Sequence, residues 1–326
     1  MTIALYDAER VEHLLDYPGC IAAMRHAMRA LSEGKAQPLR QILKVSETIL
    51  FGVMPGDLAA IDSFGAKLVS VTEDQARPGR ARHRGVVVTF AAGTGEIGSI
   101  ADAEAVTSIR TACASAAATD ALARTDAEVL AVFGAGTQAE THIRALRHVR
   151  NFRRIVVWSR STDKAAALAT RLSAELGIPI EAERDGWRAA GEADVICTVT
   201  SAKEPILFRA WVREGTHINL VGSSFLGPVE VDNALVAESR YIADYRPGAL
   251  AQASELAAAR AAGLITDDHV VGEVGAVYAG TLAGRESLDQ ITIYKSLGHV
   301  AQDLAAVSYL HGRAITASRE QIADAS

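Results

Sequence analysis

The fold is decided by the stretch Glu128-Val-Leu-Ala-Val-Phe-Gly134-Ala-Gly136-Thr-Gln138-Ala139-Glu-Thr-His-Ile-Arg-Ala-Leu146. An apolar run leads into a glycine turn, and a helical pattern follows. A short buried strand, the motif G-x-G-x-x-A and a helix together form the dinucleotide-binding turn. Gly134 allows a tight turn, Gly136 lets the backbone approach a pyrophosphate, and Ala139 permits close packing. The helix N-terminus would offer amide donors to the phosphates.

The residues after this turn continue an alternation of strands and helices. A helix is expected over 163–176, and the last clear strand is 241–244. Strands separated by helical patterns pair in parallel through right-handed crossovers. This alternation predicts a Rossmann-type, doubly wound parallel sheet over residues 121–301. The other expected strands are 155–158, 194–198 and 217–221.

The residues before the turn have a different pattern, which predicts an α+β region with a predominantly antiparallel sheet. A helix is expected over 8–33 with a break at Pro18, and a long helix over 102–124 would join the two regions. Helical spacing returns over 296–326. The Rossmann domain would therefore be inserted into a substrate-binding and dimerisation domain of residues 1–120 plus 302–326. The expected strands are 42–45, 48–54, 64–71, 86–90 and 97–100.

Composition excludes several classes of function. The net charge of −6 gives no electrostatic case for nucleic acid or an anionic membrane, and no apolar run approaches a membrane span. No signal peptide is read, so a cytoplasmic location is expected. The three cysteines, Cys20, Cys113 and Cys197, are far apart, which favours buried thiols over disulfides or a metal site. No metal is expected.

The end of the strand after the turn bears on the type of cofactor. A NAD site usually has an acidic residue there, whereas this chain has Ser159, Arg160 and Ser161, with no acid until Asp163. Because a guanidinium binds phosphate bidentately, this segment favours NADP(H) through its 2′-phosphate. The alternative is that Arg160 is a solvated loop residue, and NAD(H) stays open.

Three cations of the first region are candidates for binding an anion. Lys67 lies inside an otherwise apolar strand, where a charge needs a partner or an anionic ligand. Arg110 lies among small residues that leave space around its head. Arg40 precedes the first hairpin and by itself reads as a solvated side chain. Lys67 and Arg110 are therefore the pair expected to face a common anion.

These motifs together resemble the ornithine cyclodeaminase/μ-crystallin family. They occur in family order over nearly the whole chain, and the ordered set is much more specific than the glycine turn alone. The segments that carry the resemblance are 38–40, 53–55, 65–69, 93–95, 107–115, 134–138, 222–230, 295–298 and 302–303.

The resemblance implies a homodimer with a Rossmann domain for NAD(P). It implies that Arg40, Lys67 and Arg110 hold a substrate carboxylate beside the nicotinamide. Met54 and His83 are also expected to bind substrate. Lys67, Arg110 and Ser224 are the expected catalytic residues. Asp303, Gln302 and Glu273 receive no role. The residues expected at the cofactor are Gly134, Ala135, Gly136, Thr137, Gln138, Ser159, Arg160, Ser161, Thr198, Val221 and Ser223.

One departure from the family pattern bears on the reaction. Alignment through Gly227 and Glu230 puts Ser224 where ornithine cyclodeaminases and related alanine dehydrogenases have an aspartate. A carboxylate there can hold a substrate ammonium and assist proton transfer. Serine cannot hold a cation comparably, and it is similar to the ketimine-reductase branch of the family.

The predicted function is therefore NAD(P)H-dependent reduction of a small α-imino acid, such as Δ1-pyrroline-2-carboxylate, to the L-amino acid. Such an enzyme is an oxidoreductase acting on CH–NH or CH–NH2 groups. Reduction of an open-chain or dicarboxylic imino acid such as iminosuccinate is an alternative. If the 77–84 loop folds over the site, its cations would bind the second carboxylate, especially His83 and Arg84; the others are Arg77, Arg80 and Arg82. The alternative is that this loop is a solvated basic segment. Ornithine cyclodeamination and non-catalytic binding of NADP(H) with a small ligand also stay open.

Overall fold

The computed structural model describes residues 3–35, 37–72 and 83–324, and the chain divides into two compact units. Unit 1 consists of residues 1–110 and 299–326, and unit 2 of residues 111–298. The sequence places these boundaries after residues 120 and 301. The first change falls inside helix α3 (Ala103–Leu122), which is continuous and so contributes to both units, and the second falls just before helix α11 (Val300–Asp324).

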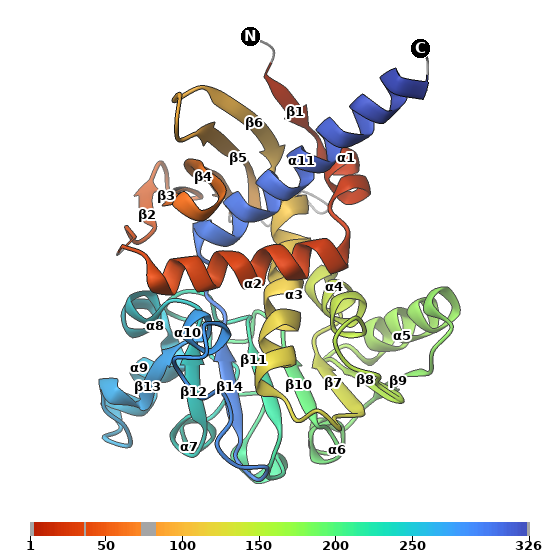
Figure 1. The fold of residues 1–326 in the computed structure, drawn as a ribbon. Coiled ribbons are helices and arrows are strands. Elements are labelled where there is room, and N and C mark those ends of the chain that lie inside the picture. The colour runs from red at the N-terminus through yellow and green to blue at the C-terminus, as the bar shows by residue number, and fades with distance from the viewer. Residues whose placement is uncertain (1–2, 36, 73–82, 325–326) are drawn as a thin grey trace. The chain divides into compact units, whose positions relative to one another are not determined.

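Unit 1 is built on a six-stranded sheet with the order β1-β6-β5-β4-β3-β2. The pairs from β2 to β6 are antiparallel, as predicted, whereas β1 pairs with β6 in parallel and was not predicted. Helix α11 runs across one face of this sheet (Figure 1), where it contacts β3, β4 and β5. The strands are β1 (Ala4–Tyr6), β2 (Gln41–Lys44), β3 (Ile49–Leu58), β4 (Ser63–Thr72), β5 (His83–Ala91) and β6 (Ile97–Asp102).

The N-terminal helical segment is two helices, α1 (Ala8–Leu14) and α2 (Tyr17–Glu33), but the break predicted at Pro18 is wrong. The Asp16 side chain accepts a hydrogen bond from the Gly19 N–H at 2.9 Å and so begins α2. Pro18 lies in the first turn of α2, where its missing N–H costs no helical hydrogen bond. A short 3-10 turn, Ala59–Ile61, joins β3 to β4.

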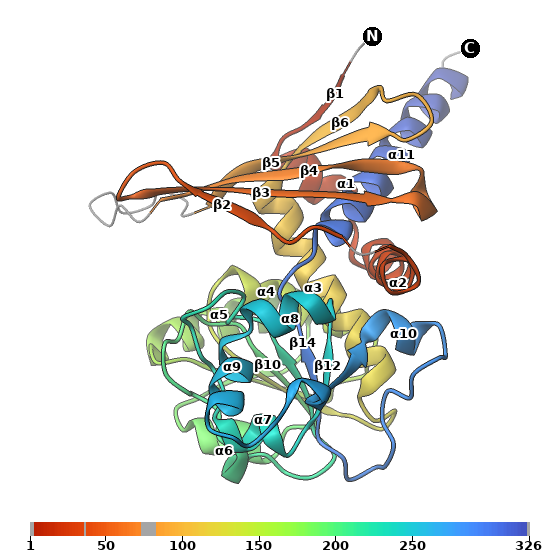
Figure 2. The same ribbon diagram turned by 90° about the vertical axis from the view of Figure 1, so that its left-hand side faces the viewer.

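Unit 2 contains an eight-stranded sheet with the order β13-β12-β14-β11-β10-β7-β8-β9, and its pairs are parallel (Figure 2). The predicted fold class is therefore confirmed. The strands are β7 (Val129–Phe133), β8 (Arg154–Trp158), β9 (Ile180–Glu183), β10 (Val195–Thr198), β11 (His217–Leu220), β12 (Arg240–Ala243), β13 (Val270–Glu273) and β14 (Thr292–Lys295).

Residues 241–244 were expected to form the last clear strand, but β13 and β14 follow them, and β14 lies between β11 and β12. Both are only four residues long and have polar or charged ends, so no apolar run marks them. The helices of unit 2 are α4 (Thr137–Leu146), α5 (Thr162–Leu176), α6 (Gly186–Gly191), α7 (Asn233–Ala237), α8 (Arg246–Gln252), α9 (Ser254–Ala261) and α10 (Val274–Tyr278), with 3-10 turns at Arg209–Trp211 and Asp267–His269.

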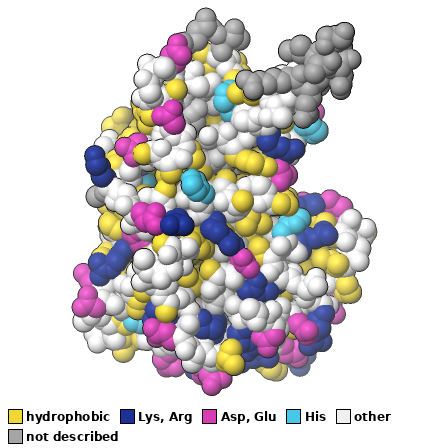
Figure 3. Space-filling view, in the orientation of Figure 1, with side chains coloured by type: hydrophobic (Ala, Val, Ile, Leu, Met, Phe, Trp, Pro, Cys, Tyr) yellow, Lys and Arg dark blue, Asp and Glu magenta, His cyan; other side chains and the backbone are white. Residues whose placement is uncertain are grey.

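The sheet of unit 2 supplies its core, in which Phe133, Tyr241 and Tyr294 are fully buried. All three cysteines are buried, as predicted. On the surface seen in Figure 3, acidic and basic side chains are intermixed. Within the described ranges, no helix is both long and apolar enough to cross a membrane.

Candidate active site and cofactor seat

A row of paired residues crosses the sheet of unit 1 and carries the predicted anion-binding lysine. Lys67 of β4 pairs with Met54 of β3 on one side and with Val87 of β5 on the other. Directly paired residues of antiparallel strands point to the same face. This is the face that α11 covers, because a side chain on neighbouring Gly65 would meet Leu304 of α11 at 3.1 Å. Met54 is half-buried in the same row.

Lys67 and Arg110 share one carboxylate oxygen. The Asp303 Oδ1 atom accepts hydrogen bonds from Lys67 Nζ and from Arg110 Nε, each at 3.1 Å, and all three side chains are buried. Lys67 Nζ also donates to the Thr107 hydroxyl. Arg110 Nη1 donates to Gln302 Oε1 at 2.6 Å. We call Lys67, Arg110, Asp303, Gln302 and Thr107 the cation cluster.

The charged groups of the cation cluster change one another's pKa values. Burial lowers the pKa of Lys67 to about 8, although the Asp303 carboxylate acts in the opposite direction. Burial alone would raise the pKa of Asp303, but Arg110 and Lys67 hold it below its usual value. Because an ammonium has three N–H donors, one N–H of Lys67 remains after Thr107 and Asp303 are satisfied.

Two further residues belong to this environment. Arg40 is half-buried just before β2, and its charge lowers the pKa of both Lys67 and His299. Burial lowers the pKa of His299 to about 4, so its ring is neutral at pH 7. The Nδ1 atom of His299 accepts from the Ala301 N–H at 3.1 Å, which leaves the ring proton on Nε2. His299 is therefore a neutral donor rather than an acid.

Asp303, Gln302 and Thr107 complete the cluster, and sequence reasoning assigned them no role. Asp303 and Gln302 are fully buried in α11 between the apolar residues Val300 and Leu304. A polar pair on the buried stripe of a helix is a signal of a buried ionic network, because such groups require partners. The partner of each could not be read from sequence, since Asp303 is 236 residues from Lys67.

His83 lies on β5, but far along this strand from Val87, the residue that pairs with Lys67 of the cation cluster. It pairs with Val71, four positions along β5 from Val87, a distance of about 13 Å at the rise of a strand. The side chain of His83 lies outside the described residues, as do Arg77, Arg80 and Arg82, while Arg84 is exposed. Their predicted contact with a second carboxylate stays a prediction.

In unit 2, the glycine turn has the properties that a pyrophosphate seat requires. Gly134 has a φ of 140°, and a side chain there would meet Val199 at 2.9 Å, so only glycine fits. Gly136 is the N-cap of α4 and provides no side-chain cap, and nothing lies within 4 Å of a Cβ placed on it. The first-turn N–H groups of Thr137 and Gln138 therefore lie beside open space, which fits a bound phosphate.

The segment predicted to bind the ribose side of the cofactor follows β8. The exposed guanidinium of Arg160 makes no hydrogen bond or ion pair with the described residues. Ser161 is the N-cap of α5 and accepts from the Lys164 N–H at 3.4 Å. Ser159 Oγ accepts from the Ser161 N–H at 3.3 Å. The Arg160 guanidinium is thus the charged group of this segment, and no described residue neutralises it.

The loop after β11 contains Ser224, which is half-buried and whose hydroxyl has no hydrogen-bond partner among the described residues. Its neighbour Ser223 is fully buried, and both its hydroxyl and its carbonyl oxygen accept from Lys295. Thr198 donates its hydroxyl to Glu230 at 2.9 Å, and Val221 is buried at the end of β11. Of the predicted cofactor-side residues, Thr198 and Ser223 thus have their hydroxyls engaged within the protein.

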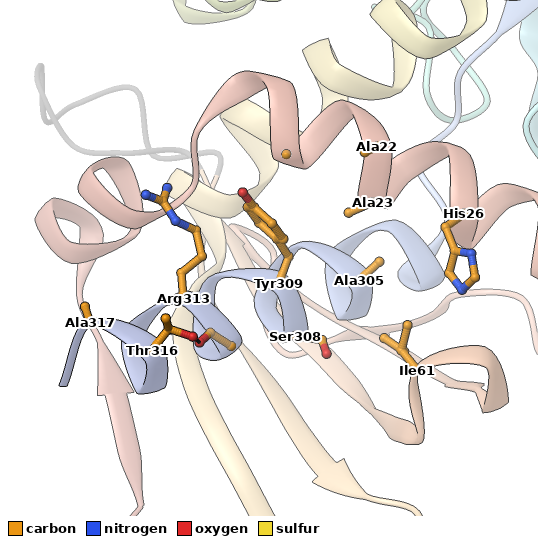
Figure 4. A pocket seen from close by; sticks show the side chains of 12 residues that line it. Ala22, Ala23, His26, Ile61, Ala305, Ser308, Tyr309, Arg313, Thr316 and Ala317 are labelled. Atoms are coloured by element: carbon orange, nitrogen blue, oxygen red, sulfur yellow. Dashed lines mark hydrogen bonds between the residues drawn. The ribbon is translucent and has the colours of Figure 1, made fainter. Parts of the chain in front are cut away.

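A groove of about 780 Å³ lies between α2 and α11 of unit 1 (Figure 4). Small and apolar residues line most of it, and none of its lining residues belongs to the cation cluster. Within the groove, Tyr309 donates its hydroxyl to Asp16 at 2.7 Å. The groove is therefore separate from the predicted chemistry. Among the described residues, no group of three His, Cys, Asp or Glu side chains is placed to hold a metal ion.

Comparison with known proteins identifies the family. The family model described as "Ornithine cyclodeaminase/mu-crystallin family" matches residues 2–318. The chain belongs to this family. The predicted resemblance is therefore confirmed over nearly the whole chain.

This family member is similar to the ketimine reductase mu-crystallin of Mus musculus, with 31% identity over 314 residues that cover 94% of this chain and 96% of the relative. Its structure is similar to that of the Δ1-pyrroline-2-carboxylate reductase of Thermococcus litoralis in complex with NADH and L-proline. The TM-score is 0.91, the identity 29%, and the coverage 97% of this chain and 98% of that chain. The iminosuccinate reductase of Paracoccus denitrificans in complex with NAD+ has a TM-score of 0.90, 29% identity and 97% coverage of both chains.

Proposed function

We propose that this chain is an NAD(P)H-dependent reductase of small α-imino acids, with a cyclic ketimine such as Δ1-pyrroline-2-carboxylate as substrate and the L-amino acid as product. The charge balance of the cation cluster carries the proposal. Two buried cations, Lys67 and Arg110, share the single carboxylate of Asp303. Buried charges require compensation, so the cluster has room for one more anion. The similarity to reductases of this substrate class supports the same conclusion.

In this proposal, unit 1 binds the substrate by its carboxylate. Arg110 and the remaining N–H of Lys67 donate to the carboxylate oxygens, and Arg40 adds a third positive charge. Asp303 holds both cations in place before substrate arrives, so the hydrogen bonds form without reorganisation of the site.

The reaction adds a hydride to the imine carbon and a proton to the imine nitrogen. Bound NAD(P)H supplies the hydride. The protein's part is to hold the carboxylate, exclude water and deliver the proton, for which Lys67 and a water held by the Ser224 hydroxyl are the candidates. Ser224 carries no charge and so does not favour a substrate ammonium, which argues against cyclodeamination of ornithine.

The function is tested by following the oxidation of NADPH and NADH with a panel of imines. The panel contains Δ1-pyrroline-2-carboxylate, a six-membered cyclic ketimine acid, iminosuccinate, and pyruvate with ammonia. We expect the highest kcat/KM with a cyclic ketimine. Turnover mainly of iminosuccinate would favour the dicarboxylic alternative. Tight cofactor binding without turnover of any imine would identify a binding protein instead.

We expect kcat/KM for the ketimine to fall above pH about 8, because loss of the Lys67 proton removes a positive charge from the substrate site. Below this pKa Lys67 stays protonated, so its ionisation does not change kcat/KM with pH. The measurement is a pH–rate profile of the wild type and of Lys67→Arg, whose side chain does not titrate in this range. The alkaline decrease should be absent from Lys67→Arg. A decrease that persists unchanged there would come from the substrate or from another group.

We further propose that Arg160 binds the 2′-phosphate of NADP(H). Its charge is exposed and unpaired among the described residues, and no acid precedes Asp163 in this segment. Replacing Arg160 by serine should raise KM for NADPH roughly 10-fold, the equivalent of about 1.4 kcal/mol, and leave KM for NADH within twofold. Lys164→Ser, in the first turn of α5, is the control. Equal changes for both cofactors would remove Arg160 from 2′-phosphate recognition.

We also propose a homodimer formed through the sheet face of unit 1 that α11 does not cover. By register, this open face carries one apolar set from four strands, and Leu43 is 63% exposed while Phe64 is 36% exposed. A contiguous exposed apolar face of this kind is typical of an interface between copies. The set is Leu43, Phe51, Val53, Phe64, Leu68 and Phe90.

Leu43→Glu is expected to shift the chain from dimer to monomer, because it would bury a carboxylate in an apolar interface at a cost of several kcal/mol. Sedimentation velocity measures the change. Leu288→Glu is the matched control, since Leu288 is 72% exposed in unit 2 and lies outside the open face. A Leu43→Glu variant that stays dimeric at micromolar concentration would place the interface elsewhere.

A further inference from the structure

The Rossmann unit contains a fully buried ion pair that the proposed reaction does not use. Lys295 is the last residue of β14 and pairs with Leu220 of β11 and Ala243 of β12. Its Nζ donates to Glu255 Oε1 at 2.7 Å, and both side chains have no exposed surface. This places a buried ammonium at the carboxyl edge of the sheet, which is the edge where parallel α/β sheets bind their ligands.

The other two donors of this ammonium both go to one residue. Lys295 Nζ donates to the Ser223 carbonyl oxygen at 2.6 Å and to its hydroxyl oxygen at 2.7 Å. All three donors are therefore used. Glu255 is itself oriented by the Tyr241 hydroxyl, which donates to Oε1 at 3.2 Å. Lys295 therefore holds the loop in place through the backbone of Ser223, and it also neutralises the charge of Glu255.

The same loop is held at three other points around Ser224. The Gly222 N–H donates to Glu230 at 2.7 Å, and a side chain on Gly222 would collide with Thr200 and Glu230. The Gly227 N–H donates to Ser254 Oγ at 2.7 Å, and that hydroxyl donates to the Phe225 carbonyl oxygen at 3.1 Å. The hydroxyl of Ser224 is left without a partner among the described residues.

We infer that Lys295, oriented by Glu255, is a positioning residue that fixes residues 222–224 so that the Ser224 hydroxyl is presented for turnover. The inference rests on the proposed reductase function. It assigns Lys295 no contact with substrate or cofactor, and its effect passes through Ser223. The alternative is a purely structural role, in which the ion pair only stabilises unit 2.

The two roles differ in what happens when both charges are removed. Lys295→Met alone leaves the buried Glu255 without its cation, and it removes a positive charge that counteracts the effect of burial on the pKa of Glu230 and Asp244. This single variant should therefore lose stability under either role. The double variant Lys295→Met/Glu255→Gln removes the unpaired charge and keeps an acceptor for the Tyr241 hydroxyl. It should recover most of the lost melting temperature.

A structural role predicts that the double variant also recovers kcat. The positioning role predicts that kcat for the ketimine stays about 10- to 100-fold low, because a shift of about 1 Å in a reacting group can cost that much. The KM for the cofactor should change less than kcat does, since the glycine turn is untouched. Arg124→Met is the control: it breaks a 2.6 Å ion pair with Asp194 just before β10, at the opposite edge of the same sheet. It should lower the melting temperature and keep kcat.

Hydrogen–deuterium exchange of the amides of residues 222–227 provides a readout that is independent of activity. The double variant should exchange faster in this loop than Arg124→Met does. A double variant with wild-type kcat and wild-type exchange would overturn the inference. If the wild type reduces no imine, the proposed function fails, and the exchange comparison still decides whether Lys295 orders the loop.

Discussion

Replacing Arg110 by methionine is expected to lower kcat/KM for the ketimine by about 100-fold or more. Arg110 is buried, and its guanidinium is oriented by Asp303 and Gln302, so the substrate carboxylate would meet a rigid donor. Truncating one member of a buried, hydrogen-bonded charge pair costs about 2–5 kcal/mol. Methionine retains most of the volume, so the loss reports the charge and the hydrogen bonds.

The measurement is steady-state kinetics at saturating cofactor, with the melting temperature recorded in parallel. Arg150→Met is the matched control, because Arg150 is a largely buried arginine of unit 2 that pairs with Asp120 at 2.8 Å. The control should lose melting temperature and keep kcat/KM within about threefold. An Arg110→Met variant with near wild-type kcat/KM would exclude the proposed carboxylate site.

Replacing Asp303 by asparagine is expected to lower kcat/KM by about 10- to 100-fold and to move its alkaline decrease to lower pH. Asparagine has nearly the same shape but no charge, so Lys67 and Arg110 would lose their shared counterion. Asp303 is the main influence that raises the pKa of Lys67, which burial otherwise lowers. Without it the pKa of Lys67 falls below about 8, and less of the ammonium is present at neutral pH.

A pH–rate profile of Asp303→Asn, compared with that of Asp120→Asn, tests this expectation. Asp120→Asn removes the carboxylate from the Arg150 ion pair and should leave the profile unchanged. Breaking a buried pair costs about 3–5 kcal/mol, so the assays are run well below the melting temperature of each variant. An alkaline decrease at the wild-type pH in Asp303→Asn would show that Asp303 does not tune Lys67.

The local pattern was sufficient for much of the fold. The run from Glu128 to Leu146 became β7, the glycine turn and α4, because a buried strand and an amphipathic helix are defined by spacing alone. The short strands β1, β9, β13 and β14 were not predicted, because spacing does not define so short a segment. Each is three or four residues long, and its state is decided by the neighbours with which it pairs.

Only part of the candidate site could be predicted from the sequence. Lys67 was notable by itself, because a charge inside an apolar strand requires compensation. Asp303 supplies that compensation from a helix 236 residues away, and no local rule connects the two positions. The same is true of Lys295, whose hold on Ser223 spans 72 residues.

The sequence by itself therefore determined the two kinds of sheet, the glycine turn of a dinucleotide site and the family, because these depend on residue types at fixed spacing. Only the tertiary structure decided which charges are paired. It showed that Lys67 and Arg110 share one carboxylate, and that Lys295 holds the loop of Ser224. The physical reason is that a buried charge is governed by the groups within a few ångströms of it, and folding alone determines which groups those are.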